Sequence, residues 1–476
     1  MSLSSPIFLG CFLPILLGLY AVAPRPVRNV LLLAASLFFY AWGDPKGILV
    51  LLALLVANHA LGRLADGHRG ETAARLATAL GIVLDLGALV AFKYTGLFAE
   101  SANRLFGLSL PAPRFWLPLG LSFFTFQLVS YLVDVRRRTV PAERSLFAFS
   151  LYVAFFPKIL AGPIVRYATI RGDLSDRTLR ADDFAEGLRR FARGLAKKVL
   201  LADSLAGVAN AAYPADPSAL PCLFAWAGTL CYALQLFYDF AGYSDMAIGL
   251  ARVFGFRFPE NFDHPYAACS VREFWHRWHI TLSTWFRDYL YIPLGGSRRG
   301  SLRTYANQFV VFGLCGLWHG ASWCFLVWGL WHGLGLTAER IARSFRKTNA
   351  PEPAPSLPRR ILGNLALWLF LLVGWVPFSA GSHGYGLAYA KTYLGILFTG
   401  NPGHPLQPYL PALDSYTHSV AVALLAGLLL AYPIVRPADP DRKPGAWAYA
   451  GSFALLAVAF AFAMTSRATT FIYASF

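Results

Sequence analysis

The sequence predicts an all-α, polytopic membrane protein, and three observations support this fold class. Hydrophobic residues make up 56% of the 476 positions and charged residues only 14%, whereas soluble domains contain about 25% charged residues. Apolar runs of nearly bilayer-spanning length recur along the chain. Arginine and lysine are concentrated in short segments between those runs, as the positive-inside rule requires. We therefore expect one membrane domain over residues 1–476, with about 11 or 12 transmembrane helices plus re-entrant and interfacial helices.

The formal net charge of +17 comes from these short connecting segments. The expected partner is therefore membrane lipid, in particular the anionic cytoplasmic leaflet, or an anionic cofactor at that surface. We do not expect nucleic acid as a partner. The six cysteines show no paired spacing and lie mostly in apolar runs, so the sequence predicts neither disulfides nor a metal site.

The first apolar run has no basic segment before it and no clear cleavage site, so we expect it to stay in the mature protein as a transmembrane helix. Arg25 and Arg28 follow this run, while the residues before it carry no side-chain charge, which predicts an external N-terminus. Five crossings are expected in this part of the chain, at residues 6–23, 29–42, 48–61, 76–94 and 115–135.

Residues 147–165 form an apolar run that has basic segments on both sides. A full crossing would place one of these basic segments outside. Because Pro157 and the Gly162-Pro163 pair remove helical hydrogen bonds, we expect a broken, re-entrant segment here. Lys158 within it has two possible interpretations: it attracts an acidic group of a substrate, or it extends its amine to the membrane interface.

Two further crossings are expected at residues 195–212 and 221–250. The second contains Asp239 and Asp245, and a carboxylate in an apolar run is costly unless it has a partner or water. We expect Asp239 to belong to an interior polar network, whereas Asp245 can simply mark the cytoplasmic end of the helix.

A capping box at Ser270 and Glu273 predicts that a helix begins near Val271 and continues to about Leu290. At 100° per residue its aromatic and aliphatic side chains fall on one half of the helix, and its basic and hydroxyl side chains fall on the other. His279 lies on the apolar half, so it should be buried, and a buried ionisable group needs a partner or a function. His276 lies at the border, beside the arginines.

Residues 307–318 and 323–336 are two apolar segments separated by His319, Gly320, Ala321 and Ser322. Such a break is tolerated at membrane depth where it is buried in protein or lines a wet cavity, so we expect His319 to face a cavity. A histidine there can accept a proton near neutral pH, although a buried histidine bonded to a backbone carbonyl fits the same pattern.

The rest of the chain completes the membrane domain with crossings at residues 361–378, 417–435 and 446–464. Residues 381–412 hold Lys391 as their single basic residue and are expected to form an external loop with an interfacial helix. This arrangement predicts that both termini are external.

The histidine-containing stretches closely resemble the membrane-bound O-acyltransferase family, and within it the bacterial alginate O-acetyltransferases. The resemblance spans about residues 118–378 and rests on several separated motifs in the same order. These motifs are Ser122 to Gln127, Tyr131 to Val135, Phe155 to Pro157, Ala161 to Ile164, Gln235 to Asp245, Arg272 to Ser283, Trp285 to Gly296, Gly316 to Gly320 and Gly374 to Phe378. Lys158 departs from the family, in which this position is often glutamine.

The resemblance implies a membrane-embedded O-acyltransferase of the bacterial inner membrane. His319 matches the catalytic histidine of the family and His279 its second active-site position. The implied donor is acetyl-CoA, without a metal, and the implied acceptor is the hydroxyls of an extracytoplasmic polysaccharide such as alginate, reached through an extracytoplasmic partner acyltransferase. The residues that bind the donor are not indicated.

Three other hypotheses fit parts of the pattern. His276 and His279 have an i,i+3 spacing that can hold a metal, but no third ligand lies nearby in the sequence. Cys315 lies one helical turn before His319 and can form a Cys–His nucleophile, although a buried cysteine is usually a small apolar residue. A transporter or channel that uses the same histidines to relay protons is the competing class of function, although no inverted repeat is visible.

Overall fold

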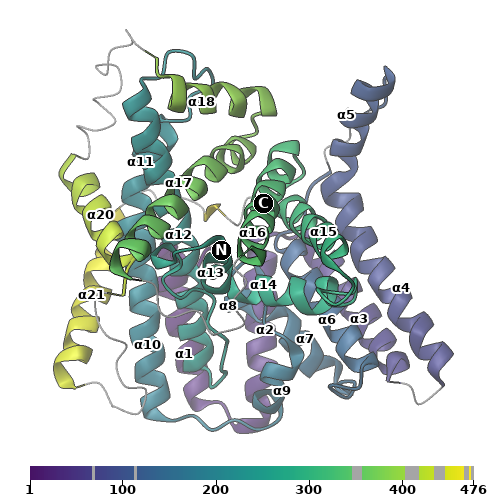
Figure 1. The fold of residues 1–476 in the computed structure, drawn as a ribbon. Coiled ribbons are helices and arrows are strands. Elements are labelled where there is room, and N and C mark those ends of the chain that lie inside the picture. Colours follow the sequence, from purple (N-terminus) through teal and green to yellow (C-terminus); the bar gives the residue numbers. More distant parts are fainter. Residues whose placement is uncertain are drawn as a thin grey trace. The chain divides into compact units, whose positions relative to one another are not determined.

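The computed structural model describes residues 1–66, 70–111, 115–345, 356–401, 417–433, 445–465 and 471–472, and all of its regular elements are helices (Figure 1). This confirms the predicted all-α class. Five of the described helices are long and apolar enough to cross a membrane: Arg25–Gly43, Gly47–Ala65, Glu71–Phe106, Leu357–Ser382 and Trp447–Thr465. The chain is therefore a multi-pass membrane protein, and the larger predicted number of crossings stays a prediction.

The chain groups into two compact units, and each is described by itself. The first comprises Met1–Ala196, Gly242–Glu260 and Ala448–Ser475. Its elements are η1 (Phe8–Phe12), α1 (Leu13–Val22), α2 (Arg25–Gly43), α3 (Gly47–Ala65), α4 (Glu71–Leu89), η2 (Val90–Tyr94), α5 (Thr95–Phe106), α6 (Leu121–Arg136), α7 (Leu146–Ala154), α8 (Phe156–Ile159), α9 (Tyr167–Ser175), α10 (Ala181–Ala196), the end of α12 (Cys222–Val253) and most of α21 (Ala446–Thr465). The single membrane domain over the whole chain stays a prediction.

Helix α6 begins at Leu121, whereas the predicted crossing begins at residue 115. Gly120 precedes it in the left-handed region, with a φ of 71°. A Cβ at Gly120 would lie 2.2 Å from the carbonyl oxygen of Ile159, so the close approach to that backbone requires glycine. Gly120 lies in the turn that immediately precedes α6.

The apolar segment at residues 147–165 is broken, as its prolines and glycines predict. Helix α7 ends at Ala154, α8 has only 4 residues, and the N–H of Phe156 donates to Oγ of Ser36 at 3.1 Å. The two flanks of the segment meet, because the hydroxyl of Tyr167 donates to Oε2 of Glu143 at 2.6 Å. An unbroken crossing helix would hold these flanks apart, so the break is confirmed, and the re-entrant position of the segment in the membrane stays a prediction.

Lys158 lies within this broken segment and is completely buried. Its Nζ donates to Oε1 of Gln127 and lies 4.9 Å from the ring centroid of Tyr152. The interpretation that Lys158 extends its amine to the membrane interface is therefore wrong. The amine stays inside the protein because Gln127 of α6 and Tyr152 of α7 provide it with a polar and an aromatic partner there.

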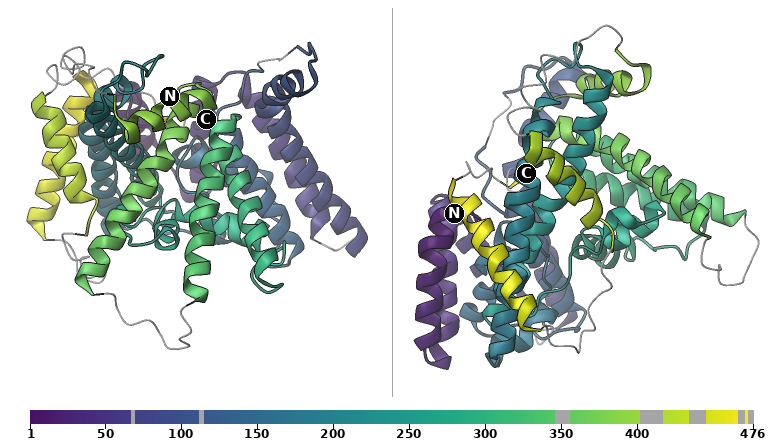
Figure 2. Two further views of the ribbon diagram at one scale, coloured as in Figure 1. Left: turned by 45° about the horizontal axis from the view of Figure 1, so that its top comes forward. Right: turned by 90° about the vertical axis from the view of Figure 1, so that its left-hand side faces the viewer.

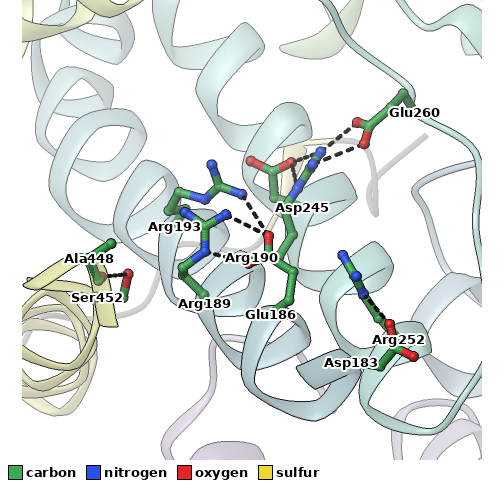
Figure 3. Close-up of polar contacts among 10 residues, drawn as sticks. All are labelled: Asp183, Glu186, Arg189, Arg190, Arg193, Asp245, Arg252, Glu260, Ala448 and Ser452. Carbon is green, nitrogen blue, oxygen red and sulfur yellow. Dashed lines mark hydrogen bonds and ion pairs between the residues drawn. The ribbon is translucent and has the colours of Figure 1, made fainter. Parts of the chain in front are cut away.

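Helix α10 packs closely against the end of α12 within the first unit. A Cβ at Gly187 would lie 2.7 Å from the carbonyl oxygen of Gly249, and one at Gly194 would lie 2.6 Å from that of Gly242. Ion pairs surround this glycine contact: Arg190 bridges Asp245 and Glu260, as Figure 3 shows. Asp245 therefore forms an ion pair with Arg190 in this unit, in addition to lying toward the end of α12. The residues drawn in Figure 3 are Asp183, Glu186, Arg189, Arg190, Arg193, Asp245, Arg252, Glu260, Ala448 and Ser452.

The second unit comprises Lys197–Ala241, Asn261–Trp447 and Phe476. Its elements are η3 (Lys197–Ala202), α11 (Asp203–Ala211), the first part of α12, η4 (Pro265–Ala267), α13 (Val271–Arg277), α14 (Ile280–Phe286), η5 (Arg287–Tyr291), α15 (Ser301–His319), α16 (Trp323–Ser344), α17 (Leu357–Ser382), α18 (Leu387–Thr399) and α20 (Thr417–Leu430). The predicted interfacial helix corresponds to α18, and residues 402–416 of the same predicted loop lie outside the described residues.

Asp239 belongs to a buried polar network, as predicted. Nζ of Lys198 lies 2.7 Å from Oδ1 of Asp239 and 2.8 Å from Oδ1 of Asp203. Lys198 and Asp239 are each about 1% exposed. Because a buried carboxylate is tolerated when a cation and hydrogen bonds compensate it, Lys198 explains how Asp239 sits in an apolar run.

The two predicted apolar segments lie in helices α15 and α16, which run side by side in Figures 1 and 2. They cross where the first glycines of two identical Gly-Leu-Trp-His-Gly sequences meet, at Gly316 and Gly329. A Cβ at Gly316 would lie 2.2 Å from the carbonyl oxygen of Phe325, and one at Gly329 would lie 2.1 Å from that of Phe312. The short distance between the two helices brings the histidine of each sequence to the same packed interior.

Candidate active site

The predicted amphipathic helix is interrupted at its centre. Ser270 caps α13 as expected, with its Oγ accepting from the N–H of Glu273 at 3.1 Å. However, α13 ends at Arg277, α14 starts at Ile280, and a π-helical turn, η5, follows α14. The prediction of one continuous helix from Val271 to Leu290 is therefore wrong, although its predicted apolar face is buried from Phe274 to Phe286.

The break is held by a neighbouring segment of the same unit. The N–H of Asp263 donates to the carbonyl oxygen of Arg277, and the N–H of Ile280 donates to that of Asn261, each at 2.9 Å. These bonds replace helical hydrogen bonds that a break would leave unmade. His279 lies between them with a φ of 42°, in the left-handed region that a non-glycine residue adopts at an energetic cost. Such strain persists where the surrounding structure imposes it, and it is concentrated at functional sites.

The side chain of His279 is completely buried, as predicted, and its protonation state follows from its hydrogen bonds. Oδ1 of Asn261 accepts from Oγ1 of Thr281 at 2.8 Å and from its N–H, so the atom facing Nδ1 of His279 at 3.0 Å is an acceptor. Nδ1 must therefore carry the hydrogen and donate it, which leaves the lone pair on Nε2. Helices α13 and α14 have 7 residues each, too short to span a bilayer. Burial lowers the pKa of His279 to about 3, so the ring is neutral at physiological pH.

One indole lies between the two histidines that the sequence predicts as site residues. The ring centroid of Trp318 is 6.1 Å from that of His279 and 4.8 Å from that of His319. Phe240 contacts His279 from another side, with centroids 4.7 Å apart. The structure thus brings His279 and His319 into one aromatic cluster of the second unit.

His319 is the last residue of α15 and is only 2% exposed. Its ring packs edge-on against Trp328 at 5.0 Å and against Phe378 at 5.2 Å between centroids. The next residue must be glycine, because a Cβ at Gly320 would lie 2.1 Å from the ring of Phe325. The tight turn into α16 therefore fixes the position of the imidazole.

Sequence reasoning missed a third buried histidine, His332 of α16. It is completely buried, and its Nδ1 accepts a hydrogen bond from Nε1 of Trp275 at 3.2 Å. Trp328 lies between His332 and His319, with centroids 4.9 Å and 5.0 Å away from theirs. The repeated Gly-Leu-Trp-His-Gly sequence was the signal that would have pointed to His332.

A cavity of about 380 Å³ lies beside this cluster, between α13 and α14 on one side and α15 and α16 on the other. Arg272, His276 and Arg287 are exposed at its edge, and its buried lining includes Trp275 and Cys315. Burial and the nearby charges of Arg272 and Arg287 lower the pKa of His276. The complete lining among the described residues is Arg272, Trp275, His276, Ile280, Leu282, Ser283, Thr284, Phe286, Arg287, Tyr291, Gln308, Val311, Phe312, Cys315 and Leu336.

This geometry bears on three sequence hypotheses. Cys315, one turn before His319, lines the cavity. His319 is not among the described residues that line it, so the expectation that His319 faces a cavity stays a prediction. The break in the helix separates His276, which is exposed, from His279, which is buried, and the i,i+3 geometry needed for a shared metal ligand pair is lost.

Comparisons with known proteins match most of the chain. The model of the membrane-bound O-acyltransferase family (MBOAT) matches residues 106–377. A protein of Azotobacter vinelandii named probable alginate O-acetylase AlgI is 45% identical over 387 residues, which cover 80% of this chain and 75% of that protein. The peptidoglycan O-acetyltransferase of Helicobacter pylori is 35% identical over 426 residues, or 83% of this chain and 80% of that protein. The teichoic acid D-alanyltransferase of Bacillus subtilis is 28% identical over 242 residues, or 48% of this chain and 60% of that protein.

Proposed function

The chain belongs to the membrane-bound O-acyltransferase family, and we propose that it moves acetyl, or another short acyl group, from acetyl-CoA to hydroxyls of an extracytoplasmic polysaccharide such as alginate. The enzyme class, an O-acyltransferase, follows from the family itself. The observation that carries the proposal is the pair of buried histidines, His279 and His319, on either side of Trp318.

His319 is the proposed general base. The oxygen of the acceptor hydroxyl attacks the thioester carbonyl carbon while its proton passes to the imidazole of His319. The tetrahedral intermediate then collapses, the C–S bond breaks, and the thiolate leaves and takes up that proton. The acyl group has then moved from sulfur to oxygen, and His319 is neutral again.

His279 is proposed to orient the acceptor. Because its Nδ1–H donates to Asn261, its Nε2 lone pair can accept a hydrogen bond from an acceptor hydroxyl. The alternative role, stabilising the developing oxyanion, requires a hydrogen on Nε2 and therefore an imidazolium. Burial of His279 opposes that charge, so acceptor orientation is the role that we favour.

The cellular setting is proposed on the same basis. The relatives are bacterial, and two of them are named for alginate and peptidoglycan acetylation, which supports a bacterial inner-membrane protein acting toward the outside. We propose that both termini are external, in line with the positions of the basic segments; residues 473–476 lie outside the described residues. An extracytoplasmic partner acyltransferase is proposed to receive the acyl group on a hydroxyl and pass it to the polymer.

The test is acyl transfer by purified full-length protein with labelled acetyl-CoA as the donor, in two variants of His319. His319→Ala should lower the rate on the order of 10²–10⁴-fold, the usual contribution of a positioned base. His319→Gln should not restore it, because glutamine forms hydrogen bonds but accepts no proton at neutral pH. The matched control is Arg277→Gln, which removes a charge paired with Glu273 on α13 and leaves the histidine side chains intact.

Two results would contradict the proposed mechanism. One is near-normal turnover by His319→Gln. The other is an acyl group found by intact-protein mass spectrometry on Cys315, which would replace a base mechanism by covalent catalysis. Solute transport by a wild-type protein that transfers no acyl group would instead favour the transporter hypothesis.

A further inference from the structure

We propose that Asp85 and Asn58 form a proton-binding site inside the membrane, in which the carboxyl group of Asp85 carries a proton and pairs with the amide of Asn58. The site lies in the first unit, between α3 and α4, which pack side by side (Figure 1) and are both long and apolar enough to cross a membrane. This inference goes beyond the proposed function, because acyl transfer gives no role to either residue.

The carboxyl group of Asp85 lies in an apolar interior. The side chains of Asp85 and Asn58 are both 0% exposed. A Cβ at Gly81, one turn before Asp85, would meet the side chains of Leu132 of α6 and Leu61 of α3, so aliphatic groups of three helices pack together here. A charged carboxylate in such surroundings is costly unless a cation compensates it.

No cation compensates Asp85 among the described residues. This distinguishes it from Asp239, which lies 2.7 Å from Nζ of Lys198, and from Asp245, which lies 2.6 Å from a guanidinium nitrogen of Arg190. Within the described part of the chain, none of the titratable or charged residues on α4 or on the elements packed against it is within hydrogen-bond or ion-pair distance of Asp85. These residues are Glu71 and Arg75 of α4, His59, Arg63 and Asp66 on and after α3, Tyr131, Asp134 and Arg136 of α6, and Lys93 and Tyr94 of η2.

The hydrogen bonds of Asn58 fix the orientation of its amide. Nδ2 donates to the carbonyl oxygen of Leu54 at 3.0 Å and to Oδ1 of Asp85 at 2.7 Å, which uses both amide hydrogens. The reverse orientation would place the amide oxygen against two other oxygen atoms. Oδ1 of Asn58 is therefore the remaining polar atom, and it faces α4, because a Cβ at Gly81 would lie 3.6 Å from it.

One proton satisfies the two oxygen atoms that remain in the pair. Oδ1 of Asn58 and Oδ2 of Asp85 are buried, and neither receives a hydrogen bond from the described residues. They belong to side chains that are already bonded to each other. A hydrogen on Oδ2 of Asp85 turns this atom into a donor and gives Oδ1 of Asn58 its missing partner, and it also removes the buried charge.

The protonated pair joins α3 to α4 more strongly than the ionised pair can. An amide and a carboxylic acid exchange two hydrogen bonds, and hydrogen bonds are stronger in an apolar interior. Loss of the proton leaves a carboxylate beside the amide oxygen of Asn58, so that one hydrogen bond is lost and two acceptors face each other. The contribution of Asp85 to stability should therefore fall as the pH rises, opposite in sign to the contribution predicted for His279.

Infrared difference spectroscopy of the purified full-length protein detects this proton directly. At pH 6 solvent-exposed aspartates, which titrate at about pH 4, are ionised. The spectrum of wild type minus that of Asp85→Asn should then contain the C=O band of a protonated carboxylic acid, and this band should shift in D₂O. The matched control is Asp245→Asn, which removes a carboxylate paired with Arg190 and should change carboxylate bands only. Carboxylate bands alone in the Asp85 difference spectrum would overturn the proposal, since a water molecule can then donate to both oxygens.

Melting temperatures test the contact between the two helices. Asp85→Asn should fold and melt close to wild type at pH 6, because a second amide can exchange the same two hydrogen bonds with Asn58. From pH 6 to pH 9 the wild-type melting temperature should fall relative to that of Asp85→Asn, by about 1–3 °C per pH unit. Equal pH slopes would overturn the proposal. Failure of Asp85→Asn to fold would do so as well, because an amide can replace a protonated acid.

A small metal cation is the alternative ligand for the same two oxygen atoms. If sodium or lithium binds there, sodium or lithium chloride should raise the wild-type melting temperature above its value in choline chloride at pH 8 and leave that of Asp85→Asn unchanged. Such a difference would overturn the assignment of a proton, and we expect none. Because these measurements do not involve acyl transfer, their outcome leaves the proposed function untouched.

Discussion

Nε1 of Trp275 on α13 donates a hydrogen bond to Nδ1 of His332 on α16, across 3.2 Å inside a fully packed aromatic cluster. The two side chains are far apart in the sequence, yet each satisfies one buried polar atom of the other. Their hydrogen bond connects a wall of the cavity between α13–α14 and α15–α16 with the cluster that surrounds His319.

The Trp275–His332 pair should be energetically coupled. Trp275→Phe and His332→Leu each leave one buried polar atom unpaired, at a cost of about 1–3 kcal/mol. The double variant removes both polar atoms and should lose less stability than the sum of the single variants. Apparent melting temperatures of the four proteins in one detergent measure this, and strictly additive losses would refute the coupling.

The pH dependence of stability should include a contribution from His279. Its pKa is lowered to about 3 in the folded protein from 6.5, so below pH 6.5 the unfolded state binds a proton that the folded state does not. Stability should therefore fall as pH decreases from 6.5 toward 3, by at most about 1.4 kcal/mol per pH unit for this group. Comparing the melting curves of wild type and His279→Gln from pH 4 to pH 8 tests this, and a pH slope that is the same in both proteins would contradict it.

Removing the buried cation of Lys198 should destabilise the fold more than removing an exposed cation that also belongs to an ion pair. Lys198→Met leaves Asp203 and Asp239 without their shared cation, and loss of one partner of a buried ion pair costs about 3–5 kcal/mol. Arg75→Ala is the control, because its pair with Glu71 is exposed and should not change stability measurably. Equal melting temperatures for Lys198→Met and wild type would show that the network is not a stabilising feature.

If residues 147–165 are re-entrant, as the sequence predicts, single cysteines on the two flanks should be labelled from one side. Ser145 and Ala168 are exposed, and they flank the contact between Glu143 and Tyr167. In a background without native cysteines, Ser145→Cys and Ala168→Cys should react with an impermeant thiol reagent from the same side of the membrane. Labelling of the two positions from opposite sides would rule out the re-entrant arrangement.

The sequence alone determined the features that depend on local pattern. Its composition and apolar runs predicted an all-α membrane protein, and its capping residues located the start of α13 at Val271. The 3.6-residue periodicity predicted that His279 is buried, which the structure confirms, and placed His276 only at the border of the apolar half, where the structure has it exposed. These inferences succeeded because burial of an amphipathic face and capping of a helix involve residues that are close in the sequence.

Only the tertiary structure decided the features that depend on partners from distant segments. The helix breaks at His279 because the backbone of Asn261 and Asp263 supplies the replacement hydrogen bonds. Nothing in the sequence of residues 271–290 indicates that this distant segment binds there. Lys158 is buried because Gln127 and Tyr152 provide its surroundings. His332 joins the site through Trp275. Helical periodicity describes one element at a time, whereas each of these outcomes is set by hydrogen bonds and packing between elements that only the folded chain brings together.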